Sequence, residues 1–314
     1  MTARRWQRAL ASVAILVAVA ALLAACGDDD DATVSSKSTD TTAAKAENAS
    51  VEAPTYTITT HEDNGKYAFD VPSSMKGGVV HLVLDNSTGK EVHDFQLAIA
   101  APGHTLDEAL KQVASDQVPL EDWMKAAGGV GSAAPGQKSE ATLELPAGTY
   151  WYFCTMSNEQ TGASHAKNGM AGTLTVSGTS GADLPKTNAT ITAKDFAFDA
   201  SGLHAGSNTV EFRNEGKQLH MALIAPLAPG ATIDQVKAMM SAPPDADQSQ
   251  QPSGPPPFDF SKAVELAVLS PGQSEVAPLE LSAGRYAMIC VMPNYGTAGP
   301  PHAAMGMVHE VDIT

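Results

Sequence analysis

The chain has 314 residues, of which 43% are hydrophobic, and a formal net charge of -16. This length is enough for two ordinary domains with real apolar cores. The acidic balance argues against nucleic-acid binding and against docking on anionic lipid by charge, and it suits solubility outside the cell or a basic partner protein.

Residues 1–25 are predicted to be a signal peptide. Arg4, Arg5 and Arg8 precede an apolar stretch from Ala9 to Ala25, which is the pattern of an export signal. The stretch ends in Leu23-Ala24-Ala25-Cys26, which resembles the lipobox of bacterial lipoproteins. The resemblance implies that Cys26 is acylated and anchors the chain on the extracytoplasmic face of the cell membrane. An ordinary signal peptide and an uncleaved anchor helix are the alternatives.

Residues 26–53 are predicted to be a flexible tether. They are mostly Asp, Thr, Ser, Ala, Lys and Glu and cannot bury a core. As a coil, about 27 residues span on the order of 25–30 Å, which would hold the following domains off the membrane. A second linker, from Gly178 to Lys186, divides the rest of the chain into domains at 54–178 and 186–314.

The two domains are predicted to be copies of one unit. Residues 66–70 match residues 195–199, and residues 135–137 match residues 271–273. The offset is 127 between His93 and His220 and rises to 136 at residues 135–137, which gives the second copy nine extra residues, and we place these in the Pro-rich stretch from Pro243 to Pro257. Apolar and polar residues alternate in runs such as 141–145 and 172–176, so the expected fold class is all-β, with a β-sandwich in each copy.

One short helix is expected in each copy. Thr105 with Glu108, and Thr232 with Gln235, form Thr-x-x-Glu/Gln capping boxes, which mark helix starts. Apolar residues follow at helical spacing, so each helix is predicted to pack on the edge of its sandwich.

A set of side chains with metal-ligand chemistry occurs once in each copy. Two imidazoles, one thiolate and one thioether are the ligands of a type 1 (blue) copper centre. In both copies a His lies far upstream, and a Cys, a second His and a Met follow in that order. The first set is His93, Cys154, His165 and Met170, and the second is His220, Cys290, His302 and Met307.

The order of these residues resembles the cupredoxin family. Both Met residues are followed by a β-rich run, at 173–176 and 308–311, which is similar to the last loop and last strand of that fold. The resemblance covers nearly all of residues 54–314 and implies two tandem Greek-key cupredoxin-like domains with one or two type 1 copper ions. It implies that all eight residues above are copper ligands. Met305 competes with Met307 for the axial position, and the parallel with Met170 favours Met307.

These features predict a protein that transfers single electrons between protein partners. The related oxidases and nitrite reductases need a His beside the Cys, whereas Cys154 and Cys290 have none, so an enzyme of that kind is not expected. A Cu(I) carrier or buffer remains an alternative, because several further Met residues cluster near the sets. A metal-free interaction module is the other, with its two cysteines either free or joined by a Cys154–Cys290 disulfide in an oxidising compartment.

Overall fold

A computed structural model of the chain describes residues 51–113, 120–158, 160–242, 255–297 and 299–314. The predicted signal peptide, Cys26 and nearly all of the tether lie outside these ranges, as does most of the stretch from Pro243 to Pro257. Within the described ranges, no helix has the length and apolar character needed to cross a membrane.

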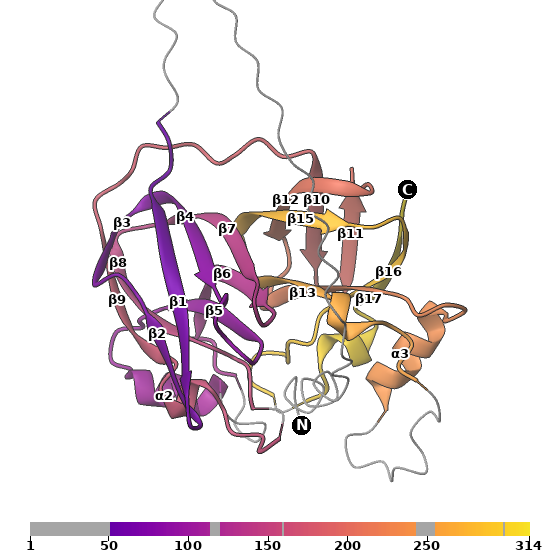
Figure 1. Ribbon diagram of the computed structural model, residues 1–314, viewed down its shortest axis with the longest axis horizontal. Helices are drawn as coiled ribbons and strands as arrows, with labels where there is room; N and C mark the ends of the chain where they lie inside the picture. The colour runs from indigo at the N-terminus through magenta and orange to yellow at the C-terminus, as the bar shows by residue number, and fades with distance from the viewer. Residues whose placement is uncertain (1–50, 114–119, 159, 243–254, 298) are drawn as a thin grey trace, which may run out of the picture.

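The two copies contain matching series of strands, drawn in indigo to magenta and in salmon to yellow in Figure 1. The first copy has β1 (Thr55–Asp63), β2 (Lys66–Asp70), β3 (Ser74–Lys76), β4 (Gly78–Asp85), β5 (His93–Ile99), α2 (Leu106–Val113), β6 (Lys125–Ala133), β7 (Lys138–Leu145), β8 (Gly148–Phe153), the 3-10 helix η1 (Ala166–Asn168) and β9 (Ala171–Ser177). The second copy has β10 (Ala189–Lys194), β11 (Ala197–Ser201), β12 (Gly206–Asn214), β13 (His220–Pro226), α3 (Ile233–Ser241), η3 (Phe260–Lys262), β14 (Val264–Leu269), β15 (Ser274–Leu281), β16 (Gly284–Ile289), η4 (His302–Met305) and β17 (Val308–Ile313).

The predicted all-β class is confirmed, and so are the helices. Strands β4 and β12 alternate between buried and less buried residues, as strands with one face on a core do. Helix α3 begins at the predicted capping box, because Thr232 Oγ1 accepts from Gln235 N and the Gln235 side chain accepts from Thr232 N. The same reciprocal bonds join Thr105 and Glu108 before α2.

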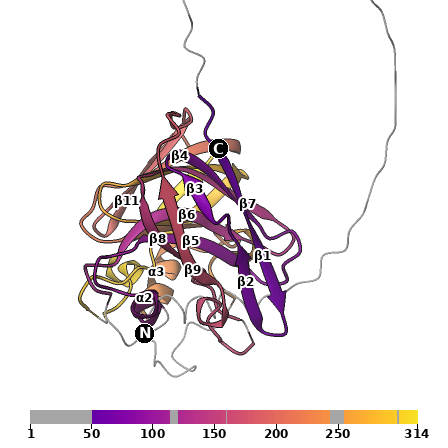
Figure 2. The ribbon, with the colours of Figure 1, turned by 90° about the vertical axis from the view of Figure 1, so that its left-hand side faces the viewer.

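Both copies contribute to the same two sheets. One sheet has the order β11-β10-β12-β15-β7-β4-β1-β2, and the other has the order β17-β16-β13-β14-β6-β5-β8-β9-β3. Figure 2 shows strands of the two sheets on either side of the first sandwich, with β1, β2 and β7 facing β5, β8 and β9. The copies meet where β15 pairs with β7 and β14 pairs with β6, both antiparallel. Two sandwiches are therefore joined edge to edge through both layers.

Each copy has its own apolar core between the sheets. The core of the first copy includes Phe95 and Leu143, and that of the second includes Phe212 and Leu279. A further cluster, centred on Trp151 and helix α2, covers the outer side of β5 and β8 and also takes in Leu219 of the second copy. Strands β5 and β13 are buried along almost their whole length, and each begins with one of the predicted copper ligands.

Candidate metal centres

The structure brings His93, Cys154 and His165 together into one buried group. Cys154 Sγ lies 3.7 Å from His93 Nδ1 and 3.6 Å from His165 Nδ1, and the two Nδ1 atoms are 3.1 Å apart. All three side chains are 0% exposed. We refer to this group, with Met170, as the Cys154 centre.

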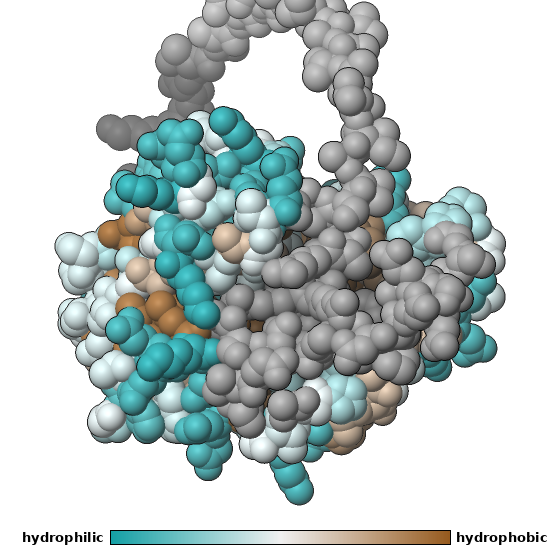
Figure 3. Space-filling model, turned by 90° about the horizontal axis from the view of Figure 1, so that it is seen from below, coloured by the Kyte–Doolittle hydropathy of each residue, from teal (hydrophilic) through white to brown (hydrophobic). Residues whose placement is uncertain are grey.

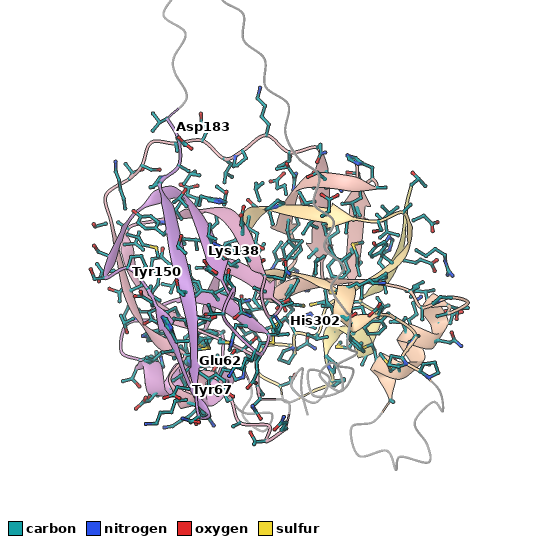
Figure 4. All side chains as sticks on the ribbon, viewed as in Figure 1. Glu62, Tyr67, Lys138, Tyr150, Asp183 and His302 are labelled. Carbon is teal, nitrogen blue, oxygen red and sulfur yellow. The ribbon has the colours of Figure 1, made fainter. Side chains whose placement is uncertain are left out.

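The second copy repeats this arrangement. Cys290 Sγ lies 3.7 Å from His220 Nδ1 and 3.5 Å from His302 Nδ1, and the two Nδ1 atoms are 3.2 Å apart. These side chains are also 0% exposed. We refer to this group, with Met307, as the Cys290 centre. Figure 4 labels Glu62 and Tyr67 beside the Cys154 centre and His302 in the Cys290 centre, and the two groups of labels lie in different halves of the molecule.

Three of the four predicted ligands of each centre come from one loop. In the first copy this loop joins β8 to β9, and it is closed by hydrogen bonds from Cys154 N to Met170 O (3.0 Å) and from His165 N to Met156 O (3.0 Å). The equivalent bonds in the second copy run from Cys290 N to Met307 O (3.2 Å) and from His302 N to Met292 O (2.8 Å). The backbone of the loop therefore fixes where the sulfur and the second imidazole lie.

One glycine permits the loop of the first copy to close. Gly169 has φ 121°, and a Cβ atom at this position would overlap the carbonyl oxygen of Tyr67. A residue with a side chain would therefore be strained there and would also push the loop away from β2.

The two predicted axial residues are buried beside the cysteines. Met170 is 0% exposed and belongs to a small cluster with Cys154 and Tyr67. Met307 is 0% exposed and lies in the same core as Cys290. Met305 is 40% exposed, and its sulfur accepts a hydrogen bond from Asn294 Nδ2 (3.3 Å). The structure thus places Met307, and not Met305, on the buried side of the second centre.

The donor atoms fit a type 1 copper ion. Bonds of about 2.0–2.1 Å to nitrogen and about 2.3 Å to sulfur, the lengths found for zinc, put the nitrogens about 3.3–3.6 Å apart and each nitrogen about 3.6–3.8 Å from sulfur at tetrahedral to trigonal angles. The distances in both centres agree with this within a few tenths of an ångström. Two imidazoles, one thiolate and a weak thioether are the type 1 set.

The outer nitrogen of each imidazole has an acceptor. His93 Nε2 lies 2.8 Å from Glu62 Oε1, His165 Nε2 lies 3.1 Å from Glu91 Oε2, and His220 Nε2 lies 3.2 Å from Asp195 Oδ1. His302 Nε2 lies 3.2 Å from Asn294 Oδ1. An ionised carboxylate only accepts, so the proton sits on Nε2 and the Nδ1 lone pair points into the centre. Two such lone pairs at about 3 Å repel each other unless a cation or a proton lies between them.

Burial favours the neutral form of His165, His220 and His302, which is the form that binds a metal. It lowers the pKa of His165 to about 4, with a further contribution from the charge of His93, and it lowers the pKa of His302 to about 4. Burial also raises the pKa of the Cys290 thiol to about 12 and that of Cys154 well above its usual range. Metal binding must therefore release a thiol proton.

Two of the outer carboxylates, Glu62 and Asp195, have lowered pKa values. Burial by itself would raise the pKa of Glu62, but hydrogen bonds from His93 and from two backbone N–H groups lower it overall. The pKa of Asp195 is lowered in the same way, by Lys217 N, His220 and Gln218 N acting against burial. Both groups can therefore accept from the imidazoles at neutral pH.

Reasoning from the sequence missed these outer residues and Tyr67. Tyr67 stacks on His165 with ring centroids 4.0 Å apart and donates to Glu91 Oε1 (2.9 Å). One signal was available, because Cys-x-Met-x-Asn occurs in both copies, at 154–158 and 290–294. Asn294 of this motif accepts a hydrogen bond from His302 Nε2, whereas Asn158 donates to Glu91 Oε1 and Tyr67 Oη.

The predicted disulfide alternative is not present. Cys154 and Cys290 are both free and buried. Each sulfur faces two imidazoles of its own copy.

No protein-family model and no curated protein matches the chain. Solved structures of copper proteins are similar to it in part. Auracyanin A, a blue copper protein from the green thermophilic photosynthetic bacterium Chloroflexus aurantiacus, is 20% identical with a TM-score of 0.29, covering 40% of this chain and 100% of its own. Rusticyanin from Thiobacillus ferrooxidans is 21% identical with a TM-score of 0.27, covering 39% of this chain and 76% of its own.

A copper nitrite reductase from Nitrosomonas europaea is 12% identical with a TM-score of 0.24, and the match covers 84% of this chain and 94% of that one. The similar structures thus include an enzyme as well as small blue copper proteins. The assignment of copper to this chain rests on its own donor atoms, which form two groups of matching geometry.

Proposed function

We propose that this chain is a copper protein that transfers single electrons through two type 1 centres. The observation that carries the proposal is the convergence of one sulfur and two Nδ1 atoms, all fully buried and within 3.7 Å of one another, in both copies. A bound copper ion would supply a one-electron Cu(II)/Cu(I) couple. His93, Cys154, His165 and Met170 would hold one ion, and His220, Cys290, His302 and Met307 the other.

The protein part of this function is to hold one geometry. The hydrogen-bonded loop and the outer acceptors fix the donor atoms before an ion is bound, so a change of oxidation state demands little rearrangement. Full burial of the donors excludes water from the centre. Neither Cys has a His neighbour that would lead to a second kind of copper site, which supports a carrier of electrons over an enzyme.

Copper titration of the purified protein tests the proposal. We expect an intense blue or green absorption band that saturates near two coppers per chain. Cys154→Ser and Cys290→Ser should each remove about half of the band, and the double variant should remove all of it. Retention of Cu(I) without Cu(II) would instead indicate a carrier or buffer, and retention of neither would indicate a metal-free interaction module.

We also propose that the protein is anchored by lipid on the extracytoplasmic face of the membrane and meets a redox partner protein there. The support is the sequence around Cys26 and the polar tether that follows it. The described part of the face shown in Figure 3 is mostly teal to white, with smaller brown patches, which is consistent with a domain held in water. In a bacterial host, Cys26→Ala should release the protein from the membrane fraction, and the mass of the mature N-terminal peptide should show acylated Cys26 only in the parent.

A further inference from the structure

The two centres differ in the group that holds the second imidazole. His165 Nε2 is bound to a carboxylate, Glu91 Oε2, whereas His302 Nε2 is bound to an amide, Asn294 Oδ1. The residue that matches Glu91 in the second copy is Gln218, and its Oε1 accepts instead from Tyr295 N (2.9 Å). The Cys290 centre therefore has one outer carboxylate, Asp195, where the Cys154 centre has two.

The surroundings of the two sulfur atoms also differ. Beside Cys154, the Asp94 side chain accepts from Thr155 N (2.7 Å) and from Thr155 Oγ1 (2.6 Å). The matching residues beside Cys290 are Met221 and Val291, and Met221 is 4% exposed. The Cys154 centre is thus polar on the side where the Cys290 centre is apolar.

Both differences favour Cu(II) at the Cys154 centre. Two neutral imidazoles and one thiolate carry a net charge of +1 with Cu(II) and of 0 with Cu(I). A carboxylate hydrogen-bonded to an imidazole makes it a stronger donor and favours the charged form, whereas apolar surroundings favour the uncharged form. Asn294 is an amide and not a carboxylate, so it does not strengthen His302 as a donor in this way.

We propose that the Cys154 centre has the lower reduction potential and the Cys290 centre the higher, so that an electron passes within the chain from the first to the second. This inference rests on the proposed function, because both centres must hold copper. The transfer oxidises Cu(I) to Cu(II) at the Cys154 centre and reduces Cu(II) to Cu(I) at the Cys290 centre. A one-electron donor protein would reduce the first centre again, and an acceptor protein would oxidise the second.

A bonded route connects the two centres across the junction of the copies. Gln96 Nε2 donates to Asp94 Oδ2 (3.1 Å), next to His93, and Gln96 Oε1 accepts from Val268 N (3.0 Å) of strand β14. The following residue, Leu269, pairs in register with His220. The route thus runs from one ligand to another through side-chain and backbone bonds of buried strands.

Reduction potentials of single-centre variants test the proposal. Cys290→Ser leaves only the Cys154 centre and Cys154→Ser leaves only the Cys290 centre, and each potential is measured by spectroelectrochemical titration of the copper-loaded chain. We expect the Cu(II)/Cu(I) equilibrium to differ at least tenfold between them, which is about 59 mV for one electron, with the Cys290 centre higher. When one electron equivalent is added to the oxidised parent, the remaining Cu(II) resonance signal should be that of the Cys154 centre.

Two reciprocal substitutions identify the cause. Glu91→Gln should raise the potential of the Cys154 centre, and Asn294→Asp should lower that of the Cys290 centre, each by at least about threefold in the equilibrium. Glu144→Gln, which removes an exposed charge of β7, should change neither. Equal or reversed potentials with both absorption bands present would overturn the inference and leave the proposed function intact. Failure of either single-centre variant to take up copper would overturn both.

Discussion

At the scale of single residues, the centres are defined by which atom of each side chain is free. Every one of the four imidazoles uses Nε2 for a hydrogen bond to an oxygen atom and turns Nδ1 towards a cysteine sulfur. The oxygen acceptors that fix this orientation belong to residues outside the ligand set, and they are not the same in the two copies. Glu62, from β1, serves His93, whereas Asp195, between β10 and β11, serves His220.

Replacing Met307 and Met305 in turn tests whether the buried methionine of the second copy is the axial ligand. Met307→Leu nearly conserves volume, so it should cost less than about 1.5 kcal/mol of stability while changing the absorption band and potential of the Cys290 centre, because the thioether is lost. Met305→Leu, at the 40% exposed position, should change neither. Spectra and potentials recorded in the Cys154→Ser background decide this, and the reverse result would make Met305 the axial ligand.

At the scale of elements, the strands that join the two copies carry buried acidic groups. Glu275 of β15 is 1% exposed, its Oε1 accepts from Ala267 N (2.8 Å), and its Oε2 has no hydrogen-bond partner. Burial, opposed mainly by the hydrogen bond from Ala267, raises the pKa of Glu275 to about 7. Burial, and then the charges of Asp94 and Glu275, raise the pKa of Glu265 on β14, in the opposite sheet, well above its usual range.

Glu275 should make the stability of the fold depend on pH. Its pKa is higher in the folded state than the unfolded value of 4.5, so the folded state binds the extra proton between these values. Its contribution to the free energy of unfolding is therefore fully present below about pH 4.5 and is lost as the pH rises to about 7. The size of this contribution is about 3 kcal/mol. Glu275→Gln, which cannot ionise, should gain most of this free energy relative to the parent between pH 5 and pH 8.

Denaturant unfolding of copper-free parent and Glu275→Gln at the two pH values measures this difference. Glu144→Gln, at an exposed position of strand β7, is the matched control and should show no such gain. An equal free energy difference between parent and Glu275→Gln at both pH values would contradict a raised pKa at this position.

At the scale of the whole molecule, the two copies are joined as one body through both sheets. The contact along β6 and β14 is close, because a Cβ atom on Gly131 would overlap the backbone carbonyl of Glu265. The loop of the Cys290 centre also reaches the first copy, where Tyr295 Oη donates to Met124 O (2.9 Å) and Gly296 N donates to Leu120 O (2.7 Å). Neither copy is independent of the other in this arrangement.

Gly131→Ala should therefore destabilise the joined fold. The added methyl group would force β6 and β14 apart, which we expect to cost roughly 1–3 kcal/mol. Gly148→Ala is a matched control, because its Cβ would lie in ordinary contact, 3.7 Å from Tyr150 Cε2, and should change stability by less than about 1 kcal/mol. Denaturant unfolding of the copper-free variants measures both values, and equal midpoints would show that the copies are not packed closely along these strands.

The sequence by itself determined the all-β class, the positions of both helices and the two candidate sets of metal ligands. These depend on local signals, which are the two-residue period of strands, the capping boxes at Thr105 and Thr232, and the order of Cys, His and Met in each copy. Most of these signals lie within short stretches of the sequence, and each of them occurs in both copies.

Only the tertiary structure decided how the centres are held and how the copies are joined. Glu62 lies 31 residues from His93, and Gln96 lies 172 residues from Val268, so these partners meet only when the strands that carry them pack together. The burial of Met307 and exposure of Met305, two residues apart, likewise depend on which side of the loop faces the core. Continuous sheets across the two copies require edge strands to pair, and the pattern of apolar residues along a strand does not specify its neighbour.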